Sequence, residues 1–532
     1  MSSLSGDTAT TFLPHVIARR AKRAPDQPAV SDGRRTVTYR DVDQLTGQFA
    51  RAFSDQKRVV LLDEKSIELV VAMLGTWRSG NLVFPVNPNV PEKRLRELLE
   101  RIKPTLVVCH PSLMETVKKY VPDTKVTFAE EIGALEPQSS DLPAMNDAIT
   151  DQTDAYCLFT SGSTGYPKGV VISHGAISNF FHGVGDYYPV SEGSICLNTS
   201  PMFFDVSLLD IFFPLYQGAH VHLSTDAANV PSRLLRSIEE NRIQFFCSVA
   251  PLLRLMADSP SFSQRFDPSS VQTIMTGADV VDVSTVQKWL RKVPGLKILN
   301  GYGPTETTCV CLLEVIDAIE PFRKSPYPIG RPLNAVTCLL EKSGEKIAEG
   351  DGELLVGGPQ VLNRYWESPE ETERKCIVFQ GERFYRTGDL VKKSPTGEYH
   401  FLGRVDDEVK IFGHRIHIAE IRRVAKLAIE AEIAVCIVHS GETQINIALA
   451  IEDSAGLTEK QIQVLQNTFK SELPAHMLPR YLATMTSLPR LGSGKLDVKQ
   501  ISELVHQELG NGGQRFQVFL DLQRKALVNE LQ

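Results

Sequence analysis

Short apolar runs alternate with amphipathic segments in the first part of this chain, and this alternation constrains the fold most. Residues 59–62, 83–86 and 105–109 have the length and composition of buried strands. Between them, residues 66–79 and 92–101 carry apolar side chains at helical spacing. Alternating strands and helices are typical of α/β proteins with parallel sheets. We therefore predict this fold class for the N-terminal part of the chain.

The later segments predict further layers. Residues 169–316 have a second α/β pattern, and residues 326–401 form short, glycine-containing strands typical of a β-rich subdomain. A chain of 532 residues exceeds what a single hydrophobic core usually supports. We expect residues 1–403 to form a large N-terminal part, residues 404–407 a hinge and residues 408–532 a small mobile α+β domain.

The composition excludes several classes of protein. A net charge of −7 offers no electrostatic basis for nucleic-acid binding. There is no run of 18 apolar residues, so we expect no membrane span. The nine cysteines are scattered and odd in number, which favours reduced thiols and a cytoplasmic location.

A loop rich in glycine and hydroxyl side chains follows the apolar run at residues 157–159. Glycines allow close approach of a ligand, and successive N–H groups in such a turn bind anions. The string does not match a Walker A loop, and a flexible surface loop is the alternative interpretation. We predict that it holds a polyphosphate, most simply ATP, through Thr160, Ser161, Gly162, Ser163, Thr164, Gly165 and Lys168.

Three further strings carry candidate chemistry. Residues 300–308 form a sharp turn after an apolar strand, where Glu306 is suited to hold Mg²⁺ beside phosphate oxygens. Residues 385–390 offer Asp389, a carboxylate able to accept two hydroxyl hydrogen bonds. Residues 489–497 place Lys495 on a glycine-flanked turn, where it can neutralise phosphate charge. Taken singly, each string is also compatible with an ordinary structural or surface turn.

Together and in this order, the strings resemble the adenylate-forming enzymes, which include peptide-synthetase adenylation domains, acyl-CoA synthetases and luciferases. The resemblance runs from about residue 14 to about residue 500. It implies catalytic roles for Lys495, Thr160 and Glu306, with Glu306 as the Mg²⁺ ligand. It implies a hinge at Asp406 and a pantetheine tunnel lined by Gly413. The ATP site that it implies comprises the loop residues above together with Gly301, Tyr302, Gly303, Thr305, Asp389, Arg404 and Lys495.

Residues 203–210 decide which branch of the family the chain resembles. In amino-acid-activating members the aspartate matching Asp205 binds the α-ammonium group, and an ammonium in a partly dehydrated cleft needs such a partner. A helix N-cap is the alternative role for Asp205. The matching side-chain pocket comprises Asp205, Val206, Leu209, Cys247, Met275, Gly277, Gly301, Cys309 and Val310. Because the lining has no further charge besides Lys495, we expect a neutral amino acid, with glycine or alanine ahead of proline, valine and larger apolar residues.

The reaction expected from the resemblance has two steps. An amino acid is activated by Mg·ATP and then loaded on the phosphopantetheine thiol of a separate carrier protein, since no carrier domain follows Lys495. The D-alanine– and glycine–carrier ligases of cell-wall and lipid A modification are relatives of that type. The alternatives are an acyl- or aryl-CoA ligase and, from another class, a non-catalytic nucleotide sensor.

The small-domain motif departs from the family pattern at three positions. Phe412, His417 and Ala419 stand where arginine, glutamate and glycine are usual. Gly413 is kept, so thioester formation remains expected. The substitutions leave the carrier contacts and the hinge geometry open.

Overall fold

The computed structural model describes residues 12–133, 146, 148–161, 167–224, 230–405, 408–411, 413–440, 444–454, 456–490, 496–510 and 516–518. It forms two compact units. The first unit comprises Met1–Pro88, Ile102–Phe159 and Gly169–Val405, and the second comprises Asn89–Arg101, Thr160–Lys168 and Asp406–Gln532.

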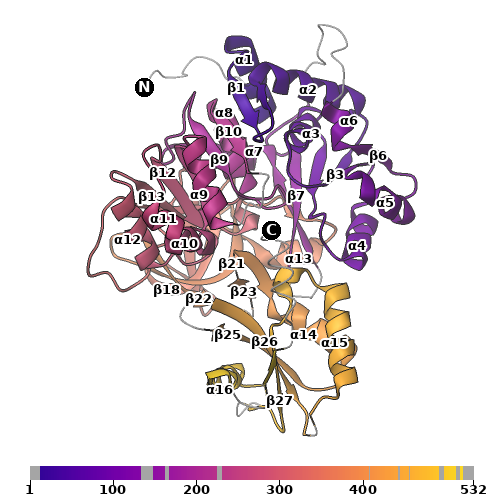
Figure 1. The fold of residues 1–532 in the computed structure, drawn as a ribbon, viewed down its shortest axis with the longest axis vertical. Helices are drawn as coiled ribbons and strands as arrows, with labels where there is room; N and C mark the ends of the chain where they lie inside the picture. The colour runs from indigo at the N-terminus through magenta and orange to yellow at the C-terminus, as the bar shows by residue number, and fades with distance from the viewer. Residues whose placement is uncertain are drawn as a thin grey trace. The chain divides into compact units, whose positions relative to one another are not determined.

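A nine-stranded sheet forms one layer of the first unit (Figure 1). Its central strands, from β13 to β1 in spatial order, pair in parallel, and the edge strands β15, β14 and β2 pair antiparallel. Parallel pairing places the carboxyl ends of β11, β12 and β13 along one edge. In spatial order the strands are β15 (Arg331–Pro332), β14 (Leu312–Ile316), β13 (Lys297–Tyr302), β12 (Thr273–Gly277), β11 (Phe245–Val249), β9 (Ile195–Asn198), β10 (His220–Leu223), β1 (Pro28–Ser31) and β2 (Thr36–Thr38).

A seven-stranded sheet holds the first predicted α/β run. Its strands are β19 (Arg364–Tyr365), β8 (Lys168–Ser173), β7 (Asp154–Thr160), β4 (Leu82–Pro85), β3 (Arg58–Leu62), β5 (Leu106–Cys109) and β6 (Lys125–Phe128). The strands from β7 to β6 pair in parallel, whereas β19 pairs antiparallel with β8. The whole of β3 from Val59 onward is buried, as expected for a strand covered on both faces.

The helix α3 (Ile67–Arg78) is buried at almost every residue. Its N-cap is Ser66, whose hydroxyl accepts a hydrogen bond from the N–H of Leu69 at 3.2 Å. A helix that is apolar on nearly all sides is stable only inside the core. Its Trp77 ring is 1% exposed and donates Nε1–H to the carbonyl of Ala155 on β7 at 2.9 Å. This contact ties α3 to the sheet that carries the predicted phosphate loop.

The other helices of the first unit cover the sheets. They are α1 (Leu13–Arg23), α2 (Tyr39–Ala52), η1 (Pro111–Leu113), α5 (Met114–Tyr120), α6 (Ala129–Gly133), α7 (His174–Gly185), the π-helical turn η2 (Leu208–Phe212), α8 (Phe213–Gln217), α9 (Pro231–Glu240), α10 (Ala250–Asp258), α11 (Pro260–Gln264), α12 (Val283–Lys292), η3 (Thr305–Thr307) and α13 (Pro369–Lys375). The helices α9, α10 and α12 lie beside the nine-stranded sheet, and α10 contacts β11 and β12 (Figure 1).

An antiparallel sheet of six strands completes the first unit. Its strands are β17 (Glu345–Ile347), β16 (Thr337–Lys342), β18 (Gly350–Gly357), β21 (Glu382–Lys393) and β20 (Cys376–Phe379), with β22 (Tyr399–Arg404) paired to β21. The long strand β21 carries Tyr385 and Asp389, and β22 ends at Arg404, whose register partner is Asp389. The sheet is the β-rich subdomain predicted from residues 326–401.

The second unit contains most of α4 (Glu92–Ile102) and the C-terminal residues. Its other elements are the hairpin β23 (Glu408–Ile411) and β24 (His414–His417), α14 (Ile418–Ala428), a sheet of β25 (Ile433–Ser440), β26 (Gln444–Glu452), β27 (Tyr481–Met485) and β28 (Phe516–Val518), and the helices α15 (Glu459–Glu472), η4 (Ala475–Met477) and α16 (Val498–Gly510). Arg94 of α4 lies 2.7 Å from Glu420 of α14, a carboxylate that is almost fully buried.

The predicted fold class is confirmed: α/β layers and a β-rich subdomain precede an α+β C-terminal region. The predicted division at residues 403 and 408 remains a prediction. The strand β28, which pairs antiparallel with β27, was not predicted. A three-residue strand has too short a pattern to be recognised without its partner.

Candidate functional site

The carboxyl ends of three parallel strands bring four of the predicted pocket residues together. Cys247 of β11 is the register partner of Met275 of β12, and Gly277 of β12 is the register partner of Gly301 of β13. These residues are far apart in the sequence but adjoin in the sheet. Ligands of open α/β sheets bind at this edge.

At two of these positions, Gly277 and Gly301, little space is available for a side chain. A Cβ built on Gly277 would lie 2.3 Å from the carbonyl oxygen of Gly301, so only glycine fits there without a backbone shift. A Cβ on Gly301 would lie 3.1 Å from the Val310 side chain and 3.4 Å from the Met275 sulfur. Gly301 therefore lies against both Met275 and Val310, and main chain forms this part of the predicted pocket.

The chain turns back sharply after β13. Thr305–Thr307 form the single turn η3, and Thr308 and Cys309 have left-handed backbone angles with φ of 60° and 70°. Left-handed residues other than glycine are uncommon, and they persist where the surroundings hold them. Here the buried Gln360 donates its amide hydrogens to the carbonyls of Thr307 and Val310 at 3.2 and 2.8 Å. The turn thus places Cys309 and Val310 beside the strand ends.

Glu306 lies in this turn and is only 1% exposed. The Tyr365 hydroxyl donates a hydrogen bond to Glu306 Oε1 at 2.8 Å and lies 3.3 Å from the hydroxyl of Tyr385. The Glu306 carbonyl accepts a bond from the N–H of Leu362 at 2.8 Å. The predicted Mg²⁺ ligand is therefore held through both its side chain and its backbone.

Asp389 accepts hydrogen bonds on both of its oxygens. The Tyr302 hydroxyl donates to Oδ2 and the Arg404 guanidinium pairs with Oδ1. Arg404 also donates to the Thr387 carbonyl at 3.2 Å. Burial, followed by the Asp389 charge, raises the pKa of Tyr302 well above its ordinary value, so its hydroxyl remains a donor. Three residues predicted for the ATP site, from β13, β21 and β22, are thus joined in one network.

Asp205 precedes the π-helical turn η2 and is half-buried. The N-cap position of this turn belongs to Ser207, whose side chain makes no capping hydrogen bond. Burial, followed by the charge of Asp205, raises the pKa of the Cys309 thiol and of the Tyr156 hydroxyl well above their ordinary values. The electric field of Asp205 therefore reaches Cys309, a second predicted pocket residue. Val206 is half-buried and Leu209 fully buried on the same segment.

A buried carboxylate five residues after Asp205 was not among the predicted site residues. Asp210 accepts hydrogen bonds from the Asn198 amide at 2.8 Å and from the backbone N–H groups of Thr199 and Ser200 at 3.0 Å. Burial raises the Asp210 pKa, and burial lowers the pKa of the nearby Lys65 to about 8. In the sequence, Asp210 is a charged residue inside the apolar run 208–213, and this position could have indicated a buried carboxylate. This network fixes the segment that carries Asp205.

The predicted phosphate loop is described only at its ends. Gly162, Ser163, Thr164 and Gly165 lie outside the described residues. Thr160 ends β7 and Lys168 begins β8, and both are half-buried. The Ser161 hydroxyl donates to the Arg415 carbonyl at 2.5 Å within the second unit.

The hairpin of the second unit carries Gly413 with φ of 79°, a left-handed angle that favours glycine. Asp406, Phe412 and Lys495 lie outside the described residues. His417 is buried, with Nε2 3.0 Å from Glu408 Oε2, and Arg415 lies 2.6 Å from the same oxygen. A glutamate at position 417 would place a second carboxylate against Glu408, whereas histidine provides a hydrogen-bond donor there.

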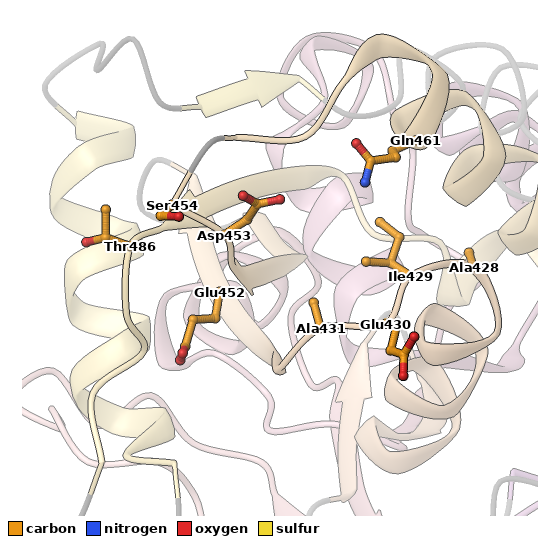
Figure 2. Close-up of a pocket in the computed structure, with 9 residues that line it drawn as sticks. All are labelled: Ala428, Ile429, Glu430, Ala431, Glu452, Asp453, Ser454, Gln461 and Thr486. Atoms are coloured by element: carbon orange, nitrogen blue, oxygen red, sulfur yellow. The ribbon is translucent and has the colours of Figure 1, made fainter.

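A groove of about 530 Å³ opens in the second unit beside the ends of α14 and β26 (Figure 2). Its lining includes Glu430, Glu452 and Asp453, whose carboxylates point in different directions in Figure 2. None of the residues predicted for the site lines it.

Several general expectations concern the described part of the chain. Its residues contain no group of three or more His, Cys, Asp or Glu side chains arranged to hold a metal ion. None of the helices among them is long and apolar enough to cross a bilayer. All nine cysteines are free thiols.

Residues 17–366 match the AMP-binding enzyme family. Tyrocidine synthase 3 from Brevibacillus parabrevis is 30% identical over 514 residues, which are 93% of this chain and 8% of that protein. Bacitracin synthase 3 from Bacillus licheniformis is 29% identical over 507 residues, or 91% of this chain and 8% of that protein. The chain thus spans less than a tenth of the length of these curated relatives.

Solved structures share the fold. The adenylation domain AlmE of Vibrio cholerae, in complex with glycyl-adenosine-5'-phosphate, has a TM-score of 0.80 at 20% identity and covers 95% of this chain and 99% of its own. An adenylation–carrier fusion, NpsA-ThdA from Klebsiella oxytoca, has a TM-score of 0.76 at 23% identity, with 94% and 97% covered. A fatty acyl CoA synthetase from Mycobacterium tuberculosis has a TM-score of 0.68 at 20% identity, with 94% and 99% covered.

Proposed function

This chain belongs to the AMP-binding enzyme family and so to the adenylate-forming enzymes, which activate an acid as its acyl-adenylate, and we propose that its acid is a neutral amino acid. The observation that carries this proposal is Asp205, a half-buried carboxylate whose field reaches Cys309. An α-ammonium group leaving water needs an opposite charge. Asp205 is the carboxylate that meets this need.

The first step transfers an adenylyl group. A substrate carboxylate oxygen attacks the α-phosphorus of ATP, the bond from that phosphorus to the bridging oxygen breaks, and pyrophosphate leaves with the electron pair. Asp389 binds the ribose hydroxyls, since each of its oxygens has a lone pair beyond those used by Tyr302 and Arg404. Lys495 neutralises charge on the phosphate oxygens. Positioning and charge neutralisation lower the barrier, and no protein nucleophile is required.

Glu306 fits a Mg²⁺ that arrives with ATP. Mg²⁺ in such sites is held by one or two carboxylates together with phosphate oxygens. The buried carboxylate of Glu306, with no cluster of further ligands among the described residues, suits that arrangement rather than an all-protein cage. When bound, Mg²⁺ supplies positive charge against the phosphate oxygens.

In the second step, a phosphopantetheine thiol of a separate carrier protein attacks the acyl carbon and AMP leaves. Gly413 lines the path of the pantetheine, and rotation about Asp406 exchanges the two faces of the C-terminal domain. The fold shared with an adenylation–carrier fusion supports this partner. The alternative function is an acyl-CoA ligase, because a fatty acyl CoA synthetase shares this fold.

The substrate is proposed to be small, such as glycine or alanine. Main chain at Gly277 and Gly301 leaves room on one side, while Met275 and Val310 lie directly against Gly301. The AlmE structure that shares this fold holds glycyl-adenosine-5'-phosphate, which supports a small amino acid.

Amino-acid-dependent ATP–pyrophosphate exchange tests the proposal. All common amino acids are assayed beside aryl and fatty acids, with wild type, Asp205→Asn and the control Asp258→Asn, a surface residue paired with Lys288. We expect exchange with a small neutral amino acid, and a loss of about 100-fold in kcat/KM in Asp205→Asn alone, as for a lost charged hydrogen bond. Exchange only with acids that lack an amino group would contradict the role of Asp205.

A further inference from the structure

The Glu306 carboxylate is approached by two tyrosines from different parts of the first unit. Tyr365 belongs to β19 and Tyr385 to β21, and both are buried, with exposures of 2% and 0%. The Tyr365 hydroxyl lies 2.8 Å from Glu306 Oε1 and 3.3 Å from the Tyr385 hydroxyl. Tyr365 is thus the middle member of a three-residue hydrogen-bonded chain.

The number of available protons decides which of these hydrogen bonds the Tyr365 hydroxyl makes. A tyrosine hydroxyl has one proton to donate, and an ionised carboxylate only accepts. Tyr365 therefore gives its single proton to Glu306 at 2.8 Å, and the Tyr385 hydroxyl, 3.3 Å away, is the more distant acceptor for the same proton. A hydrogen bond to an ionised carboxylate is stronger than one to a neutral hydroxyl, so the bond to Glu306 prevails.

The contacts between Glu306, Tyr365 and Tyr385 also connect strands that carry other residues of the predicted ATP site. Tyr365 is the register partner of Val170 on β8, the strand that begins at Lys168 after the predicted phosphate loop. Tyr385 precedes Asp389 on β21 and lies on the same strand. The hydroxyl of Tyr365 is therefore held from both strands while it bonds to Glu306.

We propose that Tyr365, supported by Tyr385, is a positioning residue that orients the Glu306 carboxylate for the metal ion that accompanies ATP. This inference rests on the proposed function, in which Glu306 is the Mg²⁺ ligand. Hydrogen-bond partners of metal ligands fix the ligand's orientation, and their loss typically weakens metal binding by about 10- to 100-fold.

The test measures Mn²⁺ binding to the full chain with α,β-methylene-ATP, which cannot be cleaved, by the electron paramagnetic resonance signal of free Mn²⁺. Wild type, Tyr365→Phe, Tyr385→Phe and Glu306→Gln are compared. The matched control is Tyr39→Phe, since Tyr39 is also fully buried and donates to the Ala219 carbonyl at 2.8 Å. Affinity for the nucleotide without metal is measured in parallel.

We expect Tyr365→Phe to weaken Mn²⁺ binding by about 10-fold or more, with metal-free nucleotide affinity unchanged. Tyr385→Phe changes Mn²⁺ affinity by about threefold or less, since it removes only the longer 3.3 Å contact of the Tyr365 hydroxyl. Tyr39→Phe leaves Mn²⁺ affinity at the wild-type value.

Three results would overturn the inference. Wild-type Mn²⁺ affinity in Tyr365→Phe, with weakened binding in Glu306→Gln, would overturn it and leave the proposed function standing. Wild-type affinity in Glu306→Gln would overturn both the inference and the metal role of Glu306. Equal loss of metal-free nucleotide affinity in Tyr365→Phe would show that the hydroxyl supports the whole site rather than the metal ligand.

Discussion

The Tyr302 hydroxyl donates a hydrogen bond to one oxygen of the Asp389 carboxylate, and Arg404 pairs with the other oxygen. Asp389 therefore has a fixed orientation before any nucleotide is considered. The Asp389 and Arg404 side chains are 3% and 9% exposed, so little water competes for this pair. Such an arrangement reduces the ordering cost of binding a ribose.

Asp389→Asn should weaken ATP binding by about 10- to 100-fold, since a charged hydrogen bond contributes roughly 1.5–3 kcal/mol. It should also lower the free energy of unfolding, because the buried Arg404 would lose the negative charge that it pairs with. Isothermal titration with ATP and thermal unfolding measure the two effects. Wild-type ATP affinity in a folded Asp389→Asn protein would exclude a ribose contact.

Gly301→Ala should narrow the proposed amino-acid pocket. The new methyl group would lie 3.1 Å from Val310 and 3.4 Å from the Met275 sulfur, so it fits only with a small shift. We expect kcat/KM in the exchange assay to fall more for valine than for glycine, by about 10-fold or more, as for one methylene of lost space.

The double variant Gly301→Ala/Val310→Ala provides the control for this experiment. Removing the Val310 methyl groups relieves the 3.1 Å contact, so part of the valine activity should return. An equal loss for glycine and valine in the single variant would show that Gly301 does not border the substrate side chain.

Separate variants should uncouple the two half-reactions. Lys495→Ala should reduce adenylate formation by about 100-fold or more, as for other groups that stabilise transition-state charge, yet largely spare thioester formation from preformed aminoacyl-AMP. Gly413→Leu should do the reverse, because φ of 79° at this position strains any other residue and its side chain enters the proposed pantetheine path. Equal loss of both steps in both variants would contradict the proposal that the two half-reactions use different conformations of the C-terminal domain.

His174 should make the stability of the protein depend on pH. Its ring is 3% exposed, and burial lowers its pKa from 6.5 to about 4. The unfolded chain therefore binds a proton more readily, so stability is full above pH 6.5 and falls as the pH decreases towards 4. The contribution at pH 5 is about 2 kcal/mol less than at pH 7.5, at roughly 1.4 kcal/mol per pKa unit.

His174→Gln provides the comparison, since it cannot be protonated in this range. The decrease in unfolding free energy between about pH 7.5 and about pH 5, measured by urea denaturation, should be smaller in the variant by about that amount. Parallel pH profiles for the two proteins would mean that His174 has the same pKa in the folded and the unfolded chain, so that burial does not lower it.

Local strings and periodic patterns were enough to predict much of this molecule. The alternation at residues 59–109 predicted β3, α3, β4, α4 and β5 within about one or two residues of their ends. The turn predicted at 300–308 also follows a strand, but β13 extends to Tyr302 and so includes the first three of these residues. These features depend on neighbours within a few positions.

Features that depend on distant residues were not predicted. Tyr365 is 59 positions from Glu306, and no local pattern indicates that its hydroxyl reaches the carboxylate. The pairing of His417 with Glu408 likewise appears only when the β23–β24 hairpin forms. The π-helical turn after Asp205 has no sequence signature that separates it from an α-helix.

The adjacency of Gly277 and Gly301 has a consequence for engineering and for divergence of the substrate range. Because a Cβ at position 277 would lie 2.3 Å from a backbone oxygen, substitution of Gly277 cannot change this side of the proposed pocket without a backbone shift. In the proposed pocket, a change of substrate would therefore come from neighbouring side chains such as Met275, Cys247 and Val310. A library that randomises these three positions and keeps both glycines should therefore sample new specificities, and most of its members should still fold.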